Sequence, residues 1–127
     1  MVLVQGANGQ GKSNLLEAIY ILAVAKSHRA STERQLIRRQ SITNESFAQI
    51  AGAINRDGGT TKLQVDFSWM ASPNSEYRDL RVKKYVHVNG IRRRGSELVG
   101  EMNAVLFTAD DLNLVYGSPT IRRRYLD

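Results

Sequence analysis

The chain has 127 residues, 42% of them hydrophobic, which is enough for one soluble domain that buries about two-thirds of its unfolded surface. It contains no cysteine, which excludes disulfides and cysteine-ligated zinc or iron–sulfur sites and suits a reducing cytoplasm, the localisation we expect. Eighteen Lys and Arg against twelve Asp and Glu leave a net charge of +6, which favours a polyanionic partner such as a nucleic acid.

The first predicted elements are a short strand, a glycine-rich loop and a helix. Residues 1–5 are apolar and partly β-branched, which predicts a buried parallel strand. Residues 6–13 read Gly-Ala-Asn-Gly-Gln-Gly-Lys-Ser and fit the phosphate-loop pattern G-x-x-x-x-G-K-S/T. Residues 12–25 contain strong helix formers and no Gly or Pro, which predicts a helix. The longest apolar run, 18–25, is too short to span a bilayer, so we expect no membrane partner.

This order of elements is the one that a phosphate-binding loop requires. Its glycines let successive N–H groups point at a phosphate oxygen, and the start of the helix adds the positive end of its dipole. Lys12 would reach the β- and γ-phosphates, and the Ser13 hydroxyl would take one site on Mg²⁺. The predicted nucleotide-binding residues are Gly6, Ala7, Asn8, Gly9, Gln10, Gly11, Lys12, Ser13 and Asn14. The alternative is a glycine-rich turn that happens to precede a helix.

A second helix is expected after an exposed connection at residues 26–29. Ser31 would cap it, with Arg34 at the position of the capping-box acid and Leu36-Ile37 on its inner side. Arg38-Arg39 would then lie at its negative end.

From Ser46 to residue 94 the pattern predicts an antiparallel β lobe. Residues 47–54 and 61–69 alternate in polarity, and the Asp57-Gly58-Gly59 segment between them predicts a hairpin. Residues 80–88 predict a third strand, which an Asn-Gly turn connects to residues 91–93. The expected inner face carries Leu63, Val65, Phe67 and Trp69 on one strand, and Val82, Lys84, Val86 and Val88 on the next.

Residues 95–127 are expected to return to the core begun by residues 1–45. They predict a short helix or turn at 95–100, a buried strand at 104–107, and helix starts at Asp110-Asp111 and Ser118-Pro119. The two aspartates either lie near a γ-phosphate or cap a helix. His28 and His87 have no third ligand or nucleophile arrangement nearby, so no catalytic residue is assigned.

The arginines are clustered, which strengthens the expectation of a nucleic-acid partner. The predicted contacts to the DNA backbone are Arg92, Arg93, Arg94, Arg122 and Arg123. The first three follow a tight turn and should project freely. The cluster at 122–124 lies on a helix and fans across roughly 200°, so at least one member should pair inside the protein, with Asp127 as a local candidate.

These residues resemble a known family. Residues 6–20, Gly-Ala-Asn-Gly-Gln-Gly-Lys-Ser-Asn-Leu-Leu-Glu-Ala-Ile-Tyr, followed by Ala-Lys-Ser-His-Arg, are similar to the N-terminal part of the RecF family of bacterial recombination-mediator ATPases. Further segments fit in order, and Gly-Ser-Pro followed by Arg-Arg-Arg-Tyr-Leu-Asp is the most specific. The resemblance covers essentially the whole chain.

The resemblance implies a fold and a function. The fold would be part of an α/β P-loop NTPase head, as in ABC and SMC proteins, with an antiparallel β lobe. The function would be ATP binding, ATP-dependent homodimerisation, and binding to single- and double-stranded DNA at gaps and junctions. Recruitment of RecR and RecO, recombinational repair, replication-fork maintenance and the SOS response would follow, with weak DNA-dependent ATPase activity.

Two departures from the family pattern matter. Its first strand and Asn-Phe-Arg segment would lie before Met1, and no Walker B acid, Ser-Gly-Gln signature or switch histidine is found. We therefore expect a fragment or truncated gene product that does not turn over ATP alone. The alternative function is another P-loop enzyme. A GTPase would need an Asn-Lys-x-Asp segment, which is absent, whereas the terminal arginines resemble those of a small-molecule kinase lid.

Overall fold

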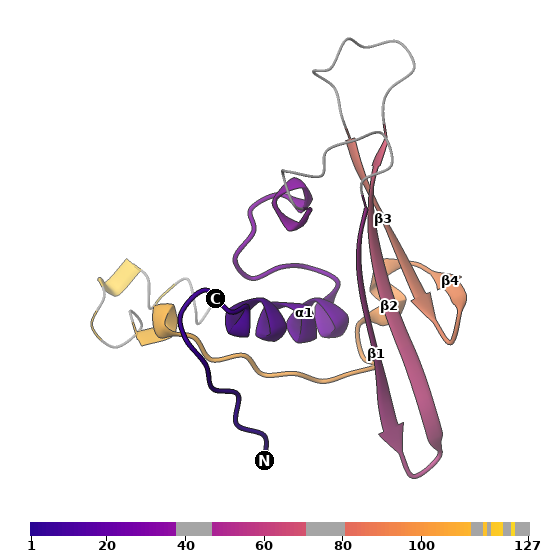
Figure 1. The fold of residues 1–127 in the computed structure, drawn as a ribbon, viewed down its shortest axis with the longest axis horizontal. Helices are drawn as coiled ribbons and strands as arrows, with labels where there is room; N and C mark the ends of the chain where they lie inside the picture. The colour runs from indigo at the N-terminus through magenta and orange to yellow at the C-terminus, as the bar shows by residue number, and fades with distance from the viewer. Residues whose placement is uncertain (38–46, 71–80, 113–115, 117, 121–122, 124–127) are drawn as a thin grey trace.

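The computed structural model describes residues 1–37, 47–70, 81–112, 116, 118–120 and 123 (Figure 1). Its elements are α1 (Lys12–Val24), the 3₁₀ helix η1 (Glu33–Leu36), β1 (Phe47–Arg56), β2 (Gly59–Met70), β3 (Arg81–Val88), β4 (Ile91–Arg93), α2 (Gly95–Leu98) and the 3₁₀ helix η3 (Ala109–Leu112). No helix among these residues is long and apolar enough to cross a membrane.

The four strands form one antiparallel sheet in the order β1-β2-β3-β4, as the alternation in the sequence predicts. Arg56 pairs with Gly59 across the first hairpin, so the turn consists of Asp57 and Gly58. The second hairpin turns at Asn89 and Gly90, whose φ angles of 51° and 78° are both positive. Asn and Gly are the residues that tolerate this conformation, which explains why the turn was predictable.

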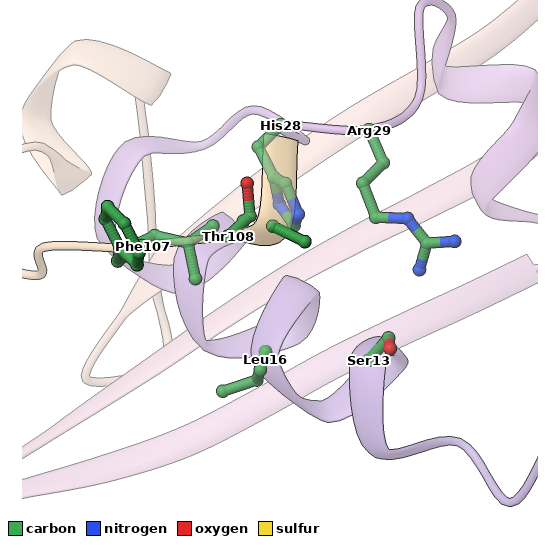
Figure 2. Close-up of a pocket in the computed structure, with 8 residues that line it drawn as sticks. Ser13, Leu16, His28, Arg29, Phe107 and Thr108 are labelled. Carbon is green, nitrogen blue, oxygen red and sulfur yellow. The ribbon is translucent and has the colours of Figure 1, made fainter. Parts of the chain in front are cut away.

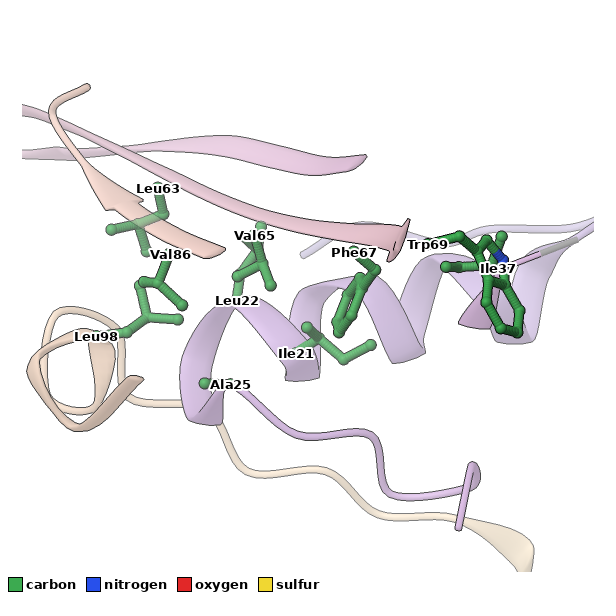
Figure 3. Close-up of a cluster of buried hydrophobic side chains, with 10 residues drawn as sticks. All are labelled: Ile21, Leu22, Ala25, Ile37, Leu63, Val65, Phe67, Trp69, Val86 and Leu98. Atoms are coloured by element: carbon green, nitrogen blue, oxygen red, sulfur yellow. The ribbon is translucent and has the colours of Figure 1, made fainter. Parts of the chain in front are cut away.

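The core lies between this sheet and the C-terminal half of α1 (Figure 3). From β2, the predicted inner-face residues Leu63, Val65, Phe67 and Trp69 are all buried. From α1, Ile21, Leu22 and Ala23 are buried, and α2 contributes Leu98. Burial of each large apolar side chain contributes about 1.5–3 kcal/mol.

Helix α1 meets the sheet with its C-terminal end, so its N-terminal end lies away from the strands (Figure 1). The helix ends at Ala25, which has φ 58° and whose N–H donates to Ile21 at 2.8 Å. The Lys84 ammonium of β3 donates to the Ala25 carbonyl at 3.0 Å and to the Glu33 carboxylate at 2.6 Å. Lys84 therefore joins the end of α1, η1 and the sheet, which explains a lysine on the apolar face.

Two predicted buried strands are not formed. Residues 1–5 and 104–107 are outside every strand, and Met1, Val2, Val105 and Phe107 are exposed. A strand is stabilised by hydrogen bonds to a neighbouring strand, and the pairing described for this chain involves β1–β4 and one bridge between Val99 and Met102. The strand predictions were wrong because apolar, β-branched composition does not supply that partner.

The second helix is shorter than predicted and begins later. It is the single 3₁₀ turn η1, and Thr32 precedes it without a capping bond from its side chain. Because Thr32 holds the cap position, Ser31 is not the cap, and its N–H donates to the side-chain carbonyl of Gln35 at 2.9 Å. Ile37 is buried as expected. Arg38 and Arg39 lie outside the described residues.

The short helices that follow the sheet match their predicted positions. Helix α2 begins at Gly95. The Arg94 N–H, which precedes the helix, donates to the Glu97 carboxylate at 2.7 Å and so closes the first turn. Pro119 and Thr120 are helical, which agrees with a helix start at Ser118-Pro119.

Candidate functional site

The predicted phosphate loop leads directly into the first turn of α1. Gly9 and Gly11 have φ angles of 82° and 89°, a conformation that a residue with a β-carbon rarely adopts. No side chain caps the start of α1, and its first turn contains no acid. The N–H groups of this turn are therefore available to an anion, and no acidic side chain of this turn offsets the positive end of the helix dipole.

Lys12 lies over the loop in this structure. Its ammonium donates to the carbonyl oxygens of Gly6 at 2.7 Å and of Ala7 at 2.6 Å. Both bonds are exposed to solvent, so exchanging them for a phosphate oxygen costs little. The contact of Lys12 with the β- and γ-phosphates stays a prediction.

A cleft of about 390 Å³ opens over the loop and the start of α1. Ligand sites commonly have volumes of about 300–1,000 Å³. Six of the nine predicted nucleotide-binding residues line it: Asn8, Gly9, Gly11, Lys12, Ser13 and Asn14. Gly6 and Ala7 hold the Lys12 ammonium, and Gln10 is exposed on the loop. The donors around the cleft suit a phosphate group.

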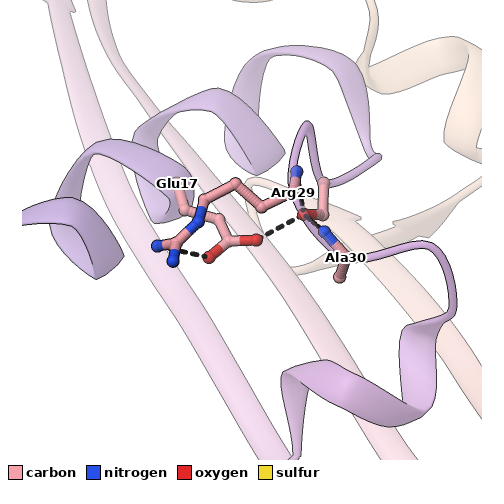
Figure 4. Close-up of polar contacts among 4 residues, drawn as sticks. Glu17, Arg29 and Ala30 are labelled. Carbon is pink, nitrogen blue, oxygen red and sulfur yellow. Dashed lines mark hydrogen bonds and ion pairs between the residues drawn. The ribbon is translucent and has the colours of Figure 1, made fainter. Parts of the chain in front are cut away.

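Arg29 also lines this cleft, although the sequence predicted only an exposed connection there. Its guanidinium lies 4.0 Å from the Glu17 carboxylate of α1 (Figure 4). The Ser27 hydroxyl donates to the same carboxylate and accepts hydrogen bonds from the N–H groups of Arg29 at 3.0 Å and Ala30 at 2.7 Å. Glu17 thus orders the 27–30 turn through Ser27, and this turn places Arg29 at the cleft.

A second pocket, of about 410 Å³, adjoins the cleft through Ser13 and Arg29 (Figure 2). Residues 106–109 form its other wall, so the segment predicted as a strand runs along α1 instead. His28 lines this pocket and makes an edge-to-face contact with Tyr20 at 5.5 Å between ring centroids. The described residues hold no group of three or more His, Cys, Asp or Glu side chains that could bind a metal.

Of the two explanations for the aspartates, capping accounts for Asp111. Its carboxylate accepts hydrogen bonds from the Thr108 N–H at 2.6 Å and the Thr108 hydroxyl at 2.9 Å, closing the first turn of η3. The backbone and then the side-chain hydrogen bond from Thr108 hold the pKa of the Asp111 carboxyl below its usual value. The side chain of Asp110 lies outside the described residues.

The arginines at 92–94 do not form one freely projecting cluster, which corrects that prediction. Arg92 is opposite His87 and Arg93 is opposite Val86, so their side chains point to opposite faces of the sheet. The Arg92 guanidinium lies 4.4 Å from the centroid of the Tyr85 ring, and the Arg93 guanidinium lies 3.6 Å from the Glu97 carboxylate.

The terminal cluster is only partly described. Arg123 is helical and exposed, whereas Arg122, Arg124 and Asp127 lie outside the described residues. The role assigned to Arg122 and Arg123 in DNA binding stays a prediction.

Comparison with known proteins relates the chain to one family. It is 42% identical over 123 residues to DNA replication and repair protein RecF of Latilactobacillus sakei subsp. sakei (strain 23K), a match that covers 96% of the chain and 28% of that protein. It is 40% identical over 125 residues to RecF of Bacillus cytotoxicus and 43% identical over 126 residues to RecF of Halalkalibacterium halodurans. Each of these matches covers 98% of the chain and 30% of the relative.

The other comparisons give no match. No family model and no solved structure matches the chain. The chain spans 28–30% of the length of the curated relatives named above, all of which are named for DNA replication and repair. The resemblance stated from the residues is confirmed, and this chain is a relative of the RecF proteins that matches less than a third of their length.

Proposed function

We propose that this chain carries the ATP-binding loop of a RecF-type DNA replication and repair protein. The observation that supports this most directly is a complete phosphate-loop sequence set at the uncapped start of α1, in a chain that is 40–43% identical to RecF proteins. The fold to which it would contribute is an ABC/SMC-like ATPase head, with the four-stranded sheet as its β lobe.

ATP would bind through its phosphates. The N–H groups around Gly11 would contact phosphate oxygens, and Lys12 would leave two loop carbonyls for the β- and γ-phosphates. The Ser13 hydroxyl would be one ligand of Mg²⁺, which neutralises phosphate charge when bound. Arg29 would add a second cation at the edge of the same cleft.

We further propose that the chain binds ATP without turning it over alone. Hydrolysis needs acidic metal ligands and a group that orients the attacking water, and the sequence offers no Walker B acid. In the whole protein, ATP binding would drive homodimerisation on gapped or junction DNA and recruitment of RecR and RecO.

Isothermal titration calorimetry tests the site. ATP should bind the chain more tightly with Mg²⁺ than with EDTA, and Ser13→Ala should reduce that difference because one metal ligand is lost. Ser31→Ala, an exposed serine outside the cleft over the phosphate loop, is the matched control. Equal affinity with and without Mg²⁺ in the parent chain would contradict the metal role of Ser13. Sustained ATP turnover by the chain would contradict the proposed lack of hydrolysis.

The alternative is a small-molecule kinase, and the pocket beside Ser13 supports it as a place for an acceptor. The two functions differ in their response to DNA. A RecF-type protein should bind double-stranded DNA in a way that ATP changes, whereas a kinase should ignore DNA and transfer phosphate to a small hydroxyl compound. Fluorescence anisotropy of labelled duplex with and without ATP distinguishes them.

A further inference from the structure

We propose that the outer face of the sheet docks the phosphate backbone of duplex DNA. The outer face is defined as the side turned away from α1. Its charged and aromatic residues on β2, β3 and β4 whose side chains the structure describes are Lys62, Asp66, Lys83, Tyr85, His87 and Arg92. This inference rests on the proposed DNA-related function and adds the surface that performs it.

Strand register places Lys62, Lys83 and Arg92 on this face. Val65 and Phe67 of β2 are buried against α1, so Lys62 points the other way. Lys83 is opposite Ser68 and Arg92 is opposite His87, and both residues belong to the same outer set. Lys62, Lys83 and Arg92 are exposed.

The single acid on this face is already engaged. Asp66 is the only Asp or Glu in the four strands, and its side chain is 19% exposed. Its carboxylate accepts hydrogen bonds from the side-chain amides of Gln49 at 2.9 Å and Gln64 at 2.9 Å, and lies 3.2 Å from Nδ1 of His87. None of these contacts involves the three cations, so the face has excess positive charge.

The cations on the two faces of the sheet differ in their ion-pair partners. On the inner face, Lys84 is bonded to Glu33, and Arg93 lies 3.6 Å from Glu97. On the outer face, no described residue provides a carboxylate for Lys62 or Lys83. Ion pairs therefore explain the two inner cations, whereas no ion pair among the described residues explains Lys62 or Lys83.

The geometry of the face suits a long, regular polyanion. Lys62 and Ser68 are six residues apart on β2, which is about 20 Å, and Lys83 lies opposite Ser68 on β3. That length matches the rise of about six base pairs of duplex. The Tyr85 ring supports the Arg92 guanidinium at 4.4 Å, which limits the side-chain freedom lost on binding. Contacts from lysine and arginine to phosphates carry no base sequence, so binding at this face should depend little on DNA sequence.

The test compares two double variants of the 127-residue chain by anisotropy with labelled duplex over a range of salt concentrations. Lys62→Gln/Lys83→Gln removes two cations from the outer face. Lys26→Gln/Arg93→Gln removes the same charge from exposed positions off that face. The outer-face variant should lower the slope of log affinity against log salt by about 1.8, at about 0.9 per phosphate contact. The control variant should leave the slope within about 0.5 of the parent.

Three results would overturn the docking surface. They are an unchanged slope in Lys62→Gln/Lys83→Gln, an equal loss in both variants, and equally tight binding of the parent to polyglutamate, which would indicate an acidic protein partner. Thermal melts and ATP calorimetry accompany each titration, because a folded variant with normal ATP affinity isolates the DNA effect. A parent chain that binds ATP and no duplex would contradict the DNA part of the proposed function as well. DNA binding that resists the outer-face changes would contradict this surface alone.

Discussion

Replacing Gly52 by alanine tests how α1 is docked on the sheet. Gly52 lies in the middle of β1, and a β-carbon there would lie 3.0 Å from Cδ1 of Leu22. Leu22 is 8% exposed and packed in the core, so the helix or the side chain must move. The contact explains why a glycine interrupts an otherwise regular strand.

The size of the effect is the difference between two terms. Overpacking a core contact costs about 1–3 kcal/mol, and replacing a glycine inside a strand by alanine returns about 0.5–1 kcal/mol. Gly52→Ala should therefore lower the free energy of unfolding by up to about 2.5 kcal/mol. Urea unfolding followed by the fluorescence of the single tryptophan, Trp69, measures it directly, because Trp69 is in the same core.

Two further variants make the test decisive. Gly58→Ala adds a methyl group in open space and should change the unfolding free energy by less than about 1 kcal/mol, in either direction. In a Leu22→Ala background the clashing methyl group is gone, so Gly52→Ala should cost nothing or stabilise. A gain in stability of Gly52→Ala in the parent background, or the same loss in the Leu22→Ala background, would refute the packing described here.

Three other changes have defined outcomes. Lys84→Met should lower the unfolding free energy by about 1–2 kcal/mol in urea titrations, because a half-exposed ion pair to Glu33 and one backbone bond are lost. Asp111→Asn should remove the stability that the ionised Asp111 carboxylate contributes through its hydrogen bonds from Thr108. That contribution is fully present above the ordinary carboxyl pKa and is lost as the pH falls through the lowered pKa of the folded state. Melts from pH 7 to pH 2 should therefore differ between parent and variant only at the upper end. Arg29→Gln should weaken ATP binding in calorimetry while Lys26→Gln does not, because only Arg29 lines the cleft over the phosphate loop.

The sequence predicted the β lobe well because its signals are local. An Asp-Gly and an Asn-Gly turn specify two hairpins within a few residues, and alternation along β2 identifies the buried face. The strand predictions for residues 1–5 and 104–107 were wrong because a parallel strand depends on non-local contacts. A parallel strand is defined by its neighbours, and the composition of the segment carries no information about whether they are present.

The candidate site was predicted only where a motif described it. The motif spacing predicts the loop and Lys12. Arg29 lies at the cleft because the chain turns back after α1, at a turn that Glu17 orders. That placement depends on tertiary contacts. The placement of Arg92 and Arg93 on opposite faces of the sheet, by contrast, could be predicted from the sequence. Side chains alternate along a strand, so recognising residues 91–93 as a strand is enough.

The most direct test of the account is the affinity of Lys12→Ala for Mg²⁺·ATP, measured by calorimetry beside Lys26→Ala. Lys12 bonds only to solvent-exposed carbonyls among the described residues, so its removal should leave the melting temperature unchanged within a few degrees. Loss of a charge-assisted contact to phosphate should weaken binding by about 1.5–3 kcal/mol, or roughly 10- to 150-fold, while Lys26→Ala binds like the parent. Parent-like ATP affinity in a folded Lys12→Ala variant would contradict the central claim that residues 6–13 form a phosphate-binding loop.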